Sequence, residues 1–236
     1  MIVIVANRWD ETPKAVASRW AVQDVGVMMP QDLSVAGWRQ SSGGLDSDVA
    51  VVEGKRVPQK EITGVLARLP CVFEEELIEI APADRRYVAA EMTAFLLFWL
   101  SRLKCPVLNR PTPTCLSGPY WHREKWVRVA AAAGIPVQPV HRHAAPTGSF
   151  AEGEFLSNPA TVTVVGRRVF GETEPVLRRR AQCMADLAGV ELLAVHFSGP
   201  ERGARFVGAD VFPKLSEDRL ADAVLEHLQG KLVRCA

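Results

Sequence analysis

Short apolar runs alternate with helix-like stretches at the start of the chain. Residues 1–6 are apolar and mostly β-branched, as in a parallel strand buried on both faces. The dipeptide Thr12-Pro13 is typical of a helix start, and the helix is predicted to end near Gln23. A second apolar run, Val25 to Met29, predicts another strand. This β-α-β order indicates a parallel sheet.

The most regular helical pattern lies between Pro82 and Leu103, where apolar residues recur at the spacing of a helix that faces a core. Further along, the pattern alternates between helices and strands. Hairpins are predicted at 48–58 and 160–170, strands at 62–69, 106–109, 135–140, 191–197 and 204–212, and helices at 120–133, 174–187 and 216–228. Together these elements predict an α/β protein.

Composition and charge narrow the function classes. The chain has 236 residues, 48% of them hydrophobic and 23% charged, with a net charge of +1. This balance gives no electrostatic basis for binding nucleic acid or an anionic membrane. No apolar run reaches the roughly 18 residues of a membrane span. Because Asn7 and Arg8 follow the first strand directly and no basic region precedes it, we expect no signal peptide and a cytoplasmic location.

The cysteines are dispersed along the chain and show no metal-binding pattern. They stand at Cys71, Cys105, Cys115, Cys183 and Cys235. No C-x-x-C pair or nearby histidine accompanies them, so we expect buried free thiols in a reducing compartment rather than a metal site.

The basic residues are unevenly distributed. The chain has 21 arginines and seven lysines, and no lysine lies between Lys125 and Lys214. This gap bears on the motifs described next.

Several runs occur in an order that resembles a known family. Residues 87–100, 105–111 and 125–137 resemble the N-terminal (pre-ATP-grasp) domain of ATP-grasp ligases. Among these enzymes, the peptide-modifying members that make graspetide macrocycles or act as ribosomal-protein glutamate ligases are the most similar. That family carries a lysine on a helix followed by an "a-G-i-P-v-p" run, which here corresponds to Lys125 and to 133–137.

The second half of the chain continues the resemblance in the same order. Residues 161–170 resemble the family's "v-V-G-d-e-v-f" hairpin, 190–197 its "g-l-e-l-l-g-v-D-f" strand, and 206–213 its "w-v-f-l-E-v-N-p-f-P" strand. The resemblance therefore implies an N-terminal parallel α/β domain of the pre-ATP-grasp type, followed by a truncated ATP-grasp-like α+β region.

The spacing between these motifs departs from the family. Only about 25 residues separate the "G-i-P-v" run from the "v-V-G" hairpin, and the lysine-free stretch spans this place. A complete three-part ligase runs to roughly 300 residues, near the size at which chains split into domains. The resemblance thus implies a first domain at 1–140, a linker at 141–159 in place of the nucleotide-covering lid, and a second region at 160–236.

The expected metal ligands also depart from the family. Such ligases form an acyl phosphate from a carboxylate and ATP, with Mg²⁺ bridging the phosphates. When the motifs are aligned, His196 takes the family's Asp position, Gly208 its Glu position and Asp210 its Asn position. One carboxylate holds Mg²⁺ poorly, because this ion requires an octahedral set of oxygen ligands.

Three hypotheses about the function remain open: an active ligase, a metal-dependent activity and a non-catalytic binding protein. An active ligase would use Lys125, Asp210 and Lys214 for Mg-ATP. A metal-dependent activity would use His196 and Asp210, since histidine suits Zn²⁺ or Fe²⁺, although a strand histidine with a local partner is the ordinary interpretation. His141 and His143 could face one way on a strand, with the same ordinary alternative.

The hypothesis that we favour is a degenerate, non-catalytic protein that binds a peptide or a partner in peptide modification. It assigns no catalytic residue and no cofactor. Its partner would be a peptide-modifying enzyme or a precursor peptide, and a homodimer is also open. Five arginines are candidates for binding an acidic peptide or a phosphate, with a solvated helix face as the alternative. They are Arg167, Arg168, Arg178, Arg179 and Arg180.

Overall fold

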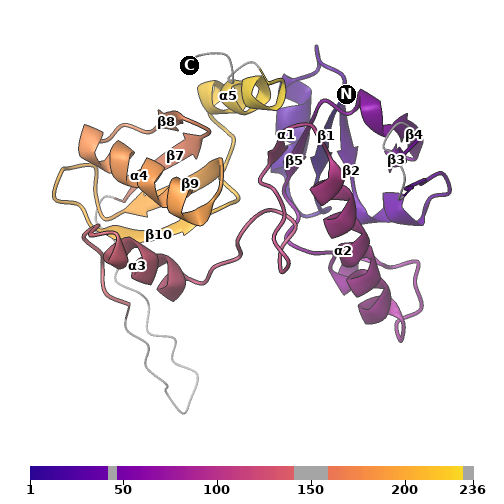
Figure 1. The fold of residues 1–236 in the computed structure, drawn as a ribbon, viewed down its shortest axis with the longest axis horizontal. Helices are drawn as coiled ribbons and strands as arrows, with labels where there is room; N and C mark the ends of the chain where they lie inside the picture. Colours follow the sequence, from indigo (N-terminus) through magenta and orange to yellow (C-terminus); the bar gives the residue numbers. More distant parts are fainter. Residues whose placement is uncertain (42–46, 141–158, 231–236) are drawn as a thin grey trace. The chain divides into compact units, whose positions relative to one another are not determined.

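The computed structural model describes residues 1–41, 47–140 and 159–230, and it divides the chain into two compact units (Figure 1). Unit 1 comprises Met1–Tyr120 and Lys214–Ala236, and unit 2 comprises Trp121–Pro213. Unit 1 contains a parallel sheet and a small hairpin, and unit 2 contains an antiparallel sheet. The predicted α/β fold class is therefore confirmed.

The main sheet of unit 1 is entirely parallel. Its strands are β1 (Ile2–Val5), β2 (Val25–Met28), β5 (Gly64–Ala67) and β6 (Val107–Leu108), in the order β2-β1-β5-β6. The β1-α1-β2 opening predicted from the apolar pattern is confirmed, with α1 (Thr12–Arg19) shorter than expected. Since parallel sheets are buried on both faces, β1 and β5 are buried at every position.

Helices cover both faces of this sheet. Helix α2 (Arg85–Arg102) lies on one face, where Trp99 and Leu100 join Val3 and Val65 in one apolar cluster. Side chains alternate along a strand, so neighbouring residues point to the opposite face. There α5 (Asp218–Leu228) packs on β5, with Leu228 against Gly64.

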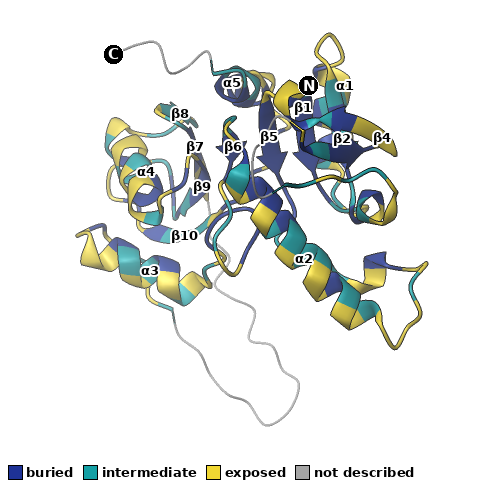
Figure 2. Ribbon diagram, turned by 45° about the vertical axis from the view of Figure 1, so that its right-hand side comes forward, coloured by how far each residue is buried: buried dark blue, intermediate teal, exposed yellow. Residues whose placement is uncertain are grey.

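Ion pairs at the surface also connect α1 with α5. Arg19 of α1 pairs with both Asp218 and Asp222 of α5, and the Nη2–Oδ2 distance to Asp222 is 2.8 Å. The outer surfaces of the helices are exposed, while the central strands β1 and β5 are buried (Figure 2). Among the described residues, no helix is both long and apolar enough to cross a bilayer.

Smaller elements complete unit 1. The predicted hairpin is confirmed as β3 (Val49–Val52) and β4 (Lys55–Pro58). Three short 3₁₀ helices lie at Pro30–Ser34, Gln59–Glu61 and Glu74–Glu76. The last of these carries the buried Glu76 and follows β5.

Unit 2 contains an antiparallel sheet, and its two helices within the described residues pack on one face. Its strands are β7 (Ala160–Val165), β8 (Arg168–Phe170), β9 (Leu192–Phe197) and β10 (Phe206–Asp210), in the order β10-β9-β7-β8. Helices α3 (Arg123–Ala132) and α4 (Pro175–Ala188) pack on it. Their residues Trp126, Leu177 and Met184 share one buried cluster with the sheet.

Two helices lie in a different unit from the one that the expected segments gave them. Helix α3, which falls in the segment 1–140, packs on β10 in unit 2. Helix α5, which falls in 160–236, belongs to unit 1. Residues 141–158 of the expected linker, with His141 and His143, lie outside the described residues.

The strand predicted at 135–140 was wrong. This segment makes one isolated parallel bridge, between Val137 and Phe206. The physical reason is that Pro136 and Pro139 have no N–H group to donate, so a longer ladder cannot form.

Candidate functional site

The register of the sheet in unit 2 brings the predicted metal positions to one face. Val195 and Phe197 of β9 point into the core beneath the helices, so His196 points to the opposite face. Gly208 of β10 is the direct neighbour of His196, and Asp210 is the neighbour of Ala194. The positions 196, 208 and 210 therefore share the sheet face opposite to α3 and α4.

His196 is a neutral, locally bonded side chain in this setting. Its Nδ1 lies 3.0 Å from the Thr161 hydroxyl on β7, whose backbone is its partner in the sheet. Burial lowers the pKa of His196, and the nearby negative charge of Asp210 opposes this effect only in part. A lowered pKa favours the uncharged imidazole at neutral pH.

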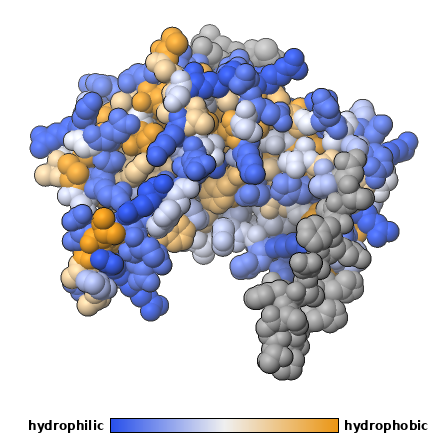
Figure 3. Space-filling view, turned by 180° about the vertical axis from the view of Figure 1, so that it is seen from behind, coloured by the Kyte–Doolittle hydropathy of each residue, from blue (hydrophilic) through white to orange (hydrophobic). Residues whose placement is uncertain are grey.

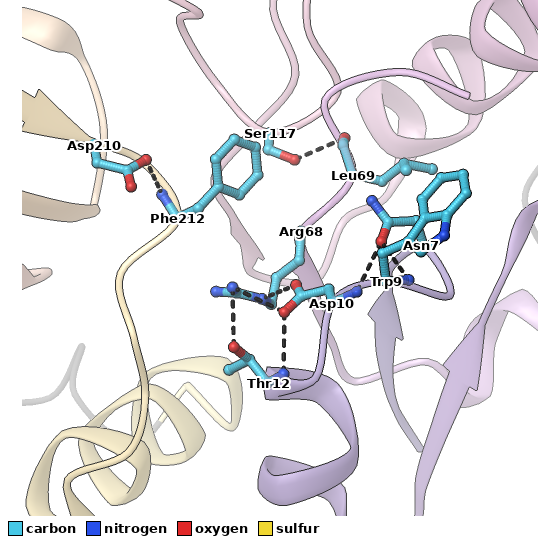
Figure 4. Close-up of polar contacts among 9 residues, drawn as sticks. All are labelled: Asn7, Trp9, Asp10, Thr12, Arg68, Leu69, Ser117, Asp210 and Phe212. Atoms are coloured by element: carbon cyan, nitrogen blue, oxygen red, sulfur yellow. Dashed lines mark hydrogen bonds and ion pairs between the residues drawn. The ribbon is translucent and has the colours of Figure 1, made fainter. Parts of the chain in front are cut away.

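This donor set does not fit Mg²⁺. Of the three aligned positions, only Asp210 supplies carboxylate oxygens, and its Oδ1 already accepts a bond from the Phe212 N–H at 2.8 Å (Figure 4). Gly208 has no side chain, and imidazole nitrogen is a poor ligand for Mg²⁺. Within 1–41, 47–140 and 159–230, no three His, Cys, Asp or Glu residues are grouped so that they could hold a metal ion.

The two lysines proposed for ATP belong to different units, and Lys125 does not lie on the sheet face of Asp210. Lys125 lies on α3, on the helix side of the sheet, and its Nζ stands 4.2 Å from the centre of the Trp121 ring. Trp121 in turn packs against Trp126, with ring centres 4.6 Å apart. Lys214 is exposed and is the first residue of the C-terminal part of unit 1.

The five arginines do not form one cluster. Arg178 donates to the Val169 carbonyl of β8 at one edge of the sheet, and Arg180 donates to the Ala204 carbonyl just before β10 at the opposite edge. These bonds follow from helix geometry, because adjacent residues point in different directions.

The remaining three differ in what they contact. Arg167 pairs with Asp186 at 3.4 Å, and both side chains are more than half exposed, which makes this a weak surface pair. Arg168 lies over the Phe170 ring at 5.3 Å. Arg179 is exposed and makes no polar contact with any described residue.

A second candidate site lies in unit 1, and the sequence motifs did not indicate it. The chain passes from β1 to β2 on one side and then crosses to β5 on the other side of β1. In open parallel sheets, ligands bind beyond the carboxyl ends of the strands where the strand order reverses in this way. Here that place is between β1 and β5, and the segments that follow them carry Asn7, Asp10 and Arg68 (Figure 4).

These side chains form one hydrogen-bonded group. The Arg68 guanidinium pairs with Asp10 through Nε at 2.6 Å and through Nη2 at 3.3 Å, and Nη2 also donates to the Thr12 hydroxyl. Asp10 Oδ1 accepts the Thr12 N–H at the start of α1, and Asn7 Oδ1 accepts the Trp9 and Asp10 N–H groups. One feature of the sequence could have indicated this site: Asn7 and Arg68 each lie within two residues of the end of an apolar strand.

Comparison with known proteins identifies the fold. No protein-family model matches the chain, and no curated protein sequence does. Solved structures of peptide-modifying ATP-grasp ligases do match it, at low sequence identity. Macrocyclase MdnC bound with precursor peptide MdnA, from Microcystis aeruginosa MRC, is 11% identical, with a TM-score of 0.69 over 97% of this chain and 99% of MdnC.

Two further structures agree. A RiPP-associated ATP-grasp ligase from Chryseobacterium gregarium, in complex with ADP and with leader and core peptides, is 12% identical, with a TM-score of 0.65 over 98% of this chain and 96% of its own. ATP-grasp ligase PsnB, complexed with a variant of its minimal precursor, Mg and ADP, is 14% identical, with a TM-score of 0.66 over 96% and 97%. The chain therefore has the ATP-grasp fold of these peptide-modifying ligases, as the motif order predicted.

Proposed function

We propose that this chain is a non-catalytic protein of the ATP-grasp fold that binds a peptide or a partner enzyme in the modification of peptides. The proposal rests on the residues at three positions on one face of β9 and β10. Where an ATP-grasp ligase would place three oxygen ligands for magnesium, this chain has His196, Gly208 and Asp210. A single carboxylate provides little to hold Mg²⁺ or to neutralise the phosphates of ATP.

The chemistry of the relatives supports the peptide part of the proposal. MdnC is bound with a precursor peptide, and the Chryseobacterium ligase with leader and core peptides. A protein that keeps this fold without the metal ligands can retain a peptide-binding role, because peptide contacts need no bound nucleotide. We expect it to act in the cytoplasm beside a complete ligase.

The decisive experiment is calorimetric titration of the full chain with ATP in the presence of Mg²⁺. The proposal expects no measurable heat of binding, with an active ATP-grasp ligase titrated in the same buffer as the positive control. Micromolar binding to the chain would contradict it.

An active ligase is the alternative, and the Mg and ADP present in the PsnB structure favour it as a second candidate. If the chain binds Mg-ATP, the variant Asp210→Ala decides where. The ligase alternative expects affinity to fall at least tenfold in this variant, because Asp210 is the one carboxylate at the aligned positions and alanine has no oxygen to offer. Glu172→Ala is a matched control, since Glu172 is an exposed acid in the turn after β8.

The partner role has its own test. The chain is mixed with a complete ATP-grasp ligase from the same organism, and the two are separated by size-exclusion chromatography with light scattering. Elution of both proteins in one peak of defined stoichiometry supports the proposal. Elution in two separate peaks, repeated with a precursor peptide present, would contradict it.

A further inference from the structure

Two cysteines of unit 1 lie in chain segments that run side by side. Cys71 follows β5, and Cys115 follows β6 after the chain has turned back at Thr112. The Leu116 N–H donates to the Pro70 carbonyl at 2.9 Å, and the Ser117 hydroxyl donates to the Leu69 carbonyl at 2.8 Å (Figure 4).

The first of these bonds joins the peptide groups next to the two cysteines. The Leu116 N–H belongs to the peptide group that follows Cys115, and the Pro70 carbonyl belongs to the peptide group that precedes Cys71. The Cα atom of each cysteine is therefore attached to one of two hydrogen-bonded peptide groups, which places Cys71 next to Cys115.

The surroundings of the Cys115 thiol agree with this proximity. Burial raises the pKa of Cys115, and the nearby Cys71 raises it further. The backbone N–H and carbonyl of Cys115 bond to Thr112 at 3.2 and 2.8 Å, so Cys115 is held at the base of this turn. Two cysteines held next to each other in this way meet the first geometric requirement of a disulfide.

We propose that Cys71 and Cys115 are a reversible disulfide pair that links the segment after β5 to the segment after β6. Both thiols are free in the structure, with Cys115 buried and Cys71 partly exposed. Cys71 also lines a surface groove of about 550 Å³ between 71–75 and α2, which admits a small oxidant. The sequence-based expectation of buried thiols holds for Cys115 and is wrong for Cys183, which is exposed.

The oxidant is a low-molecular-weight disulfide such as oxidised glutathione. The Cys71 thiolate attacks one sulfur of that disulfide, forms a mixed disulfide and releases one glutathione thiolate. The Cys115 thiolate then attacks the Cys71 sulfur and releases the second glutathione. Two protein thiols are oxidised, one glutathione disulfide is reduced to two thiols, and the two protons leave with the glutathione.

The electrostatic surroundings set the speed of this reaction. Burial raises the pKa of both thiols, and the negative charges of Glu76 and Glu75 raise that of Cys71 further. Because the thiolate is the attacking species, the pair stays reduced in a strongly reducing buffer and reacts slowly at neutral pH. The disulfide would connect Cys71, in the wall of the groove, to the segment that follows β6.

The test uses the full chain incubated with oxidised glutathione, alkylated, digested with trypsin and analysed without reduction. Trypsin leaves Cys105 and Cys115 in one peptide, since Arg110 precedes proline, so the mapping is done in the Cys105→Ser variant. The proposal expects a cross-link between the peptides of Cys71 and Cys115 that dithiothreitol removes. The cross-link should persist in Cys183→Ser and disappear in Cys115→Ser.

A thermal melt gives a second readout that requires no digestion. Closing the loop between residues 71 and 115 should raise the unfolding midpoint by roughly 5–10 °C in the oxidised protein. No such rise should occur in Cys71→Ser. The proposal is overturned if Cys71 carries glutathione while Cys115 stays a free thiol, or if neither reacts and both are alkylated after unfolding.

Discussion

Arg68 and Asp10 form a two-point ion pair beyond the carboxyl ends of β5 and β1, with their side chains only 6% and 17% exposed. Each partner also bonds to Thr12 at the start of α1. The pair therefore connects the two strands at the place where the strand order reverses with the first helix of unit 1. Removing one member of such a buried ion pair lowers the stability of the fold strongly, because the remaining charge is left buried without a partner.

Removing one member of this pair should destabilise unit 1. We expect Asp10→Ala to lower the free energy of unfolding by about 3 kcal/mol. Arg68→Lys should also be destabilising, because lysine cannot reproduce a two-point contact. Urea unfolding measures both changes. Glu11→Ala is the control, since Glu11 is exposed and makes no side-chain cap bond; an equal loss in this variant would contradict the assignment.

Glu76 should make the stability of unit 1 depend on pH. Its carboxyl group is fully buried. Burial raises its pKa and outweighs the opposing effects of the Phe73 and Arg8 backbone groups beside it and of the positive charge of Arg8. The folded chain thus binds this proton more tightly than the unfolded chain does. The free energy of unfolding should fall as the pH rises from the ordinary carboxyl range through the raised pKa.

The variant Glu76→Gln removes this ionisation. We expect it to be more stable than the wild type by about 1–2 kcal/mol at pH 7 and to match it at low pH, where the wild-type carboxyl is protonated. Urea unfolding at pH 4 and pH 7 measures the difference. Glu79→Gln replaces an exposed acid of the same segment and should leave the pH profile unchanged. A wild-type profile retained in Glu76→Gln would contradict this origin of the pH dependence.

The sequence predicted those elements whose apolar pattern coincides with their packing. Strand β1 is apolar throughout because both of its faces are buried, and α2 shows helical spacing because it faces one core. The motif alignment grouped positions 196, 208 and 210 as metal-ligand positions, and the structure places them on the adjacent strands β9 and β10.

Other features depend on contacts that no local pattern encodes. Nothing in the periodicity of α5 indicates that it returns to unit 1, where Arg19 and Gly64 meet it. The same holds for the pairing of Arg68 with Asp10, which lie 58 positions apart in the sequence. Such contacts are set by topology, and a single sequence shows only the residue types involved.

Gly64 should be required for the packing of α5 on β5. A Cβ atom at this position would lie 2.6 Å from the Leu228 carbonyl oxygen, which is backbone and cannot rotate away. We expect Gly64→Ala to cost about 1–3 kcal/mol and to increase amide exchange in α5. Hydrogen exchange with mass spectrometry measures this. Gly203→Ala, at a position with no atom within 4 Å, should change neither quantity. Unchanged protection of α5 in Gly64→Ala would contradict the close contact.

His196 should remain neutral at pH 7 and should contribute to stability at that pH. Because burial lowers its pKa, the unfolded chain binds the proton more readily than the folded one. The free energy of unfolding should therefore fall as the pH drops below the ordinary histidine range toward the lowered pKa of the folded state. Asp210→Asn should lower the pKa further, since the carboxylate favours the charged ring. A titration of the histidine ring signals by NMR, with His196 assigned through His196→Gln, checks both statements. A His196 signal that titrates above its ordinary range would contradict them.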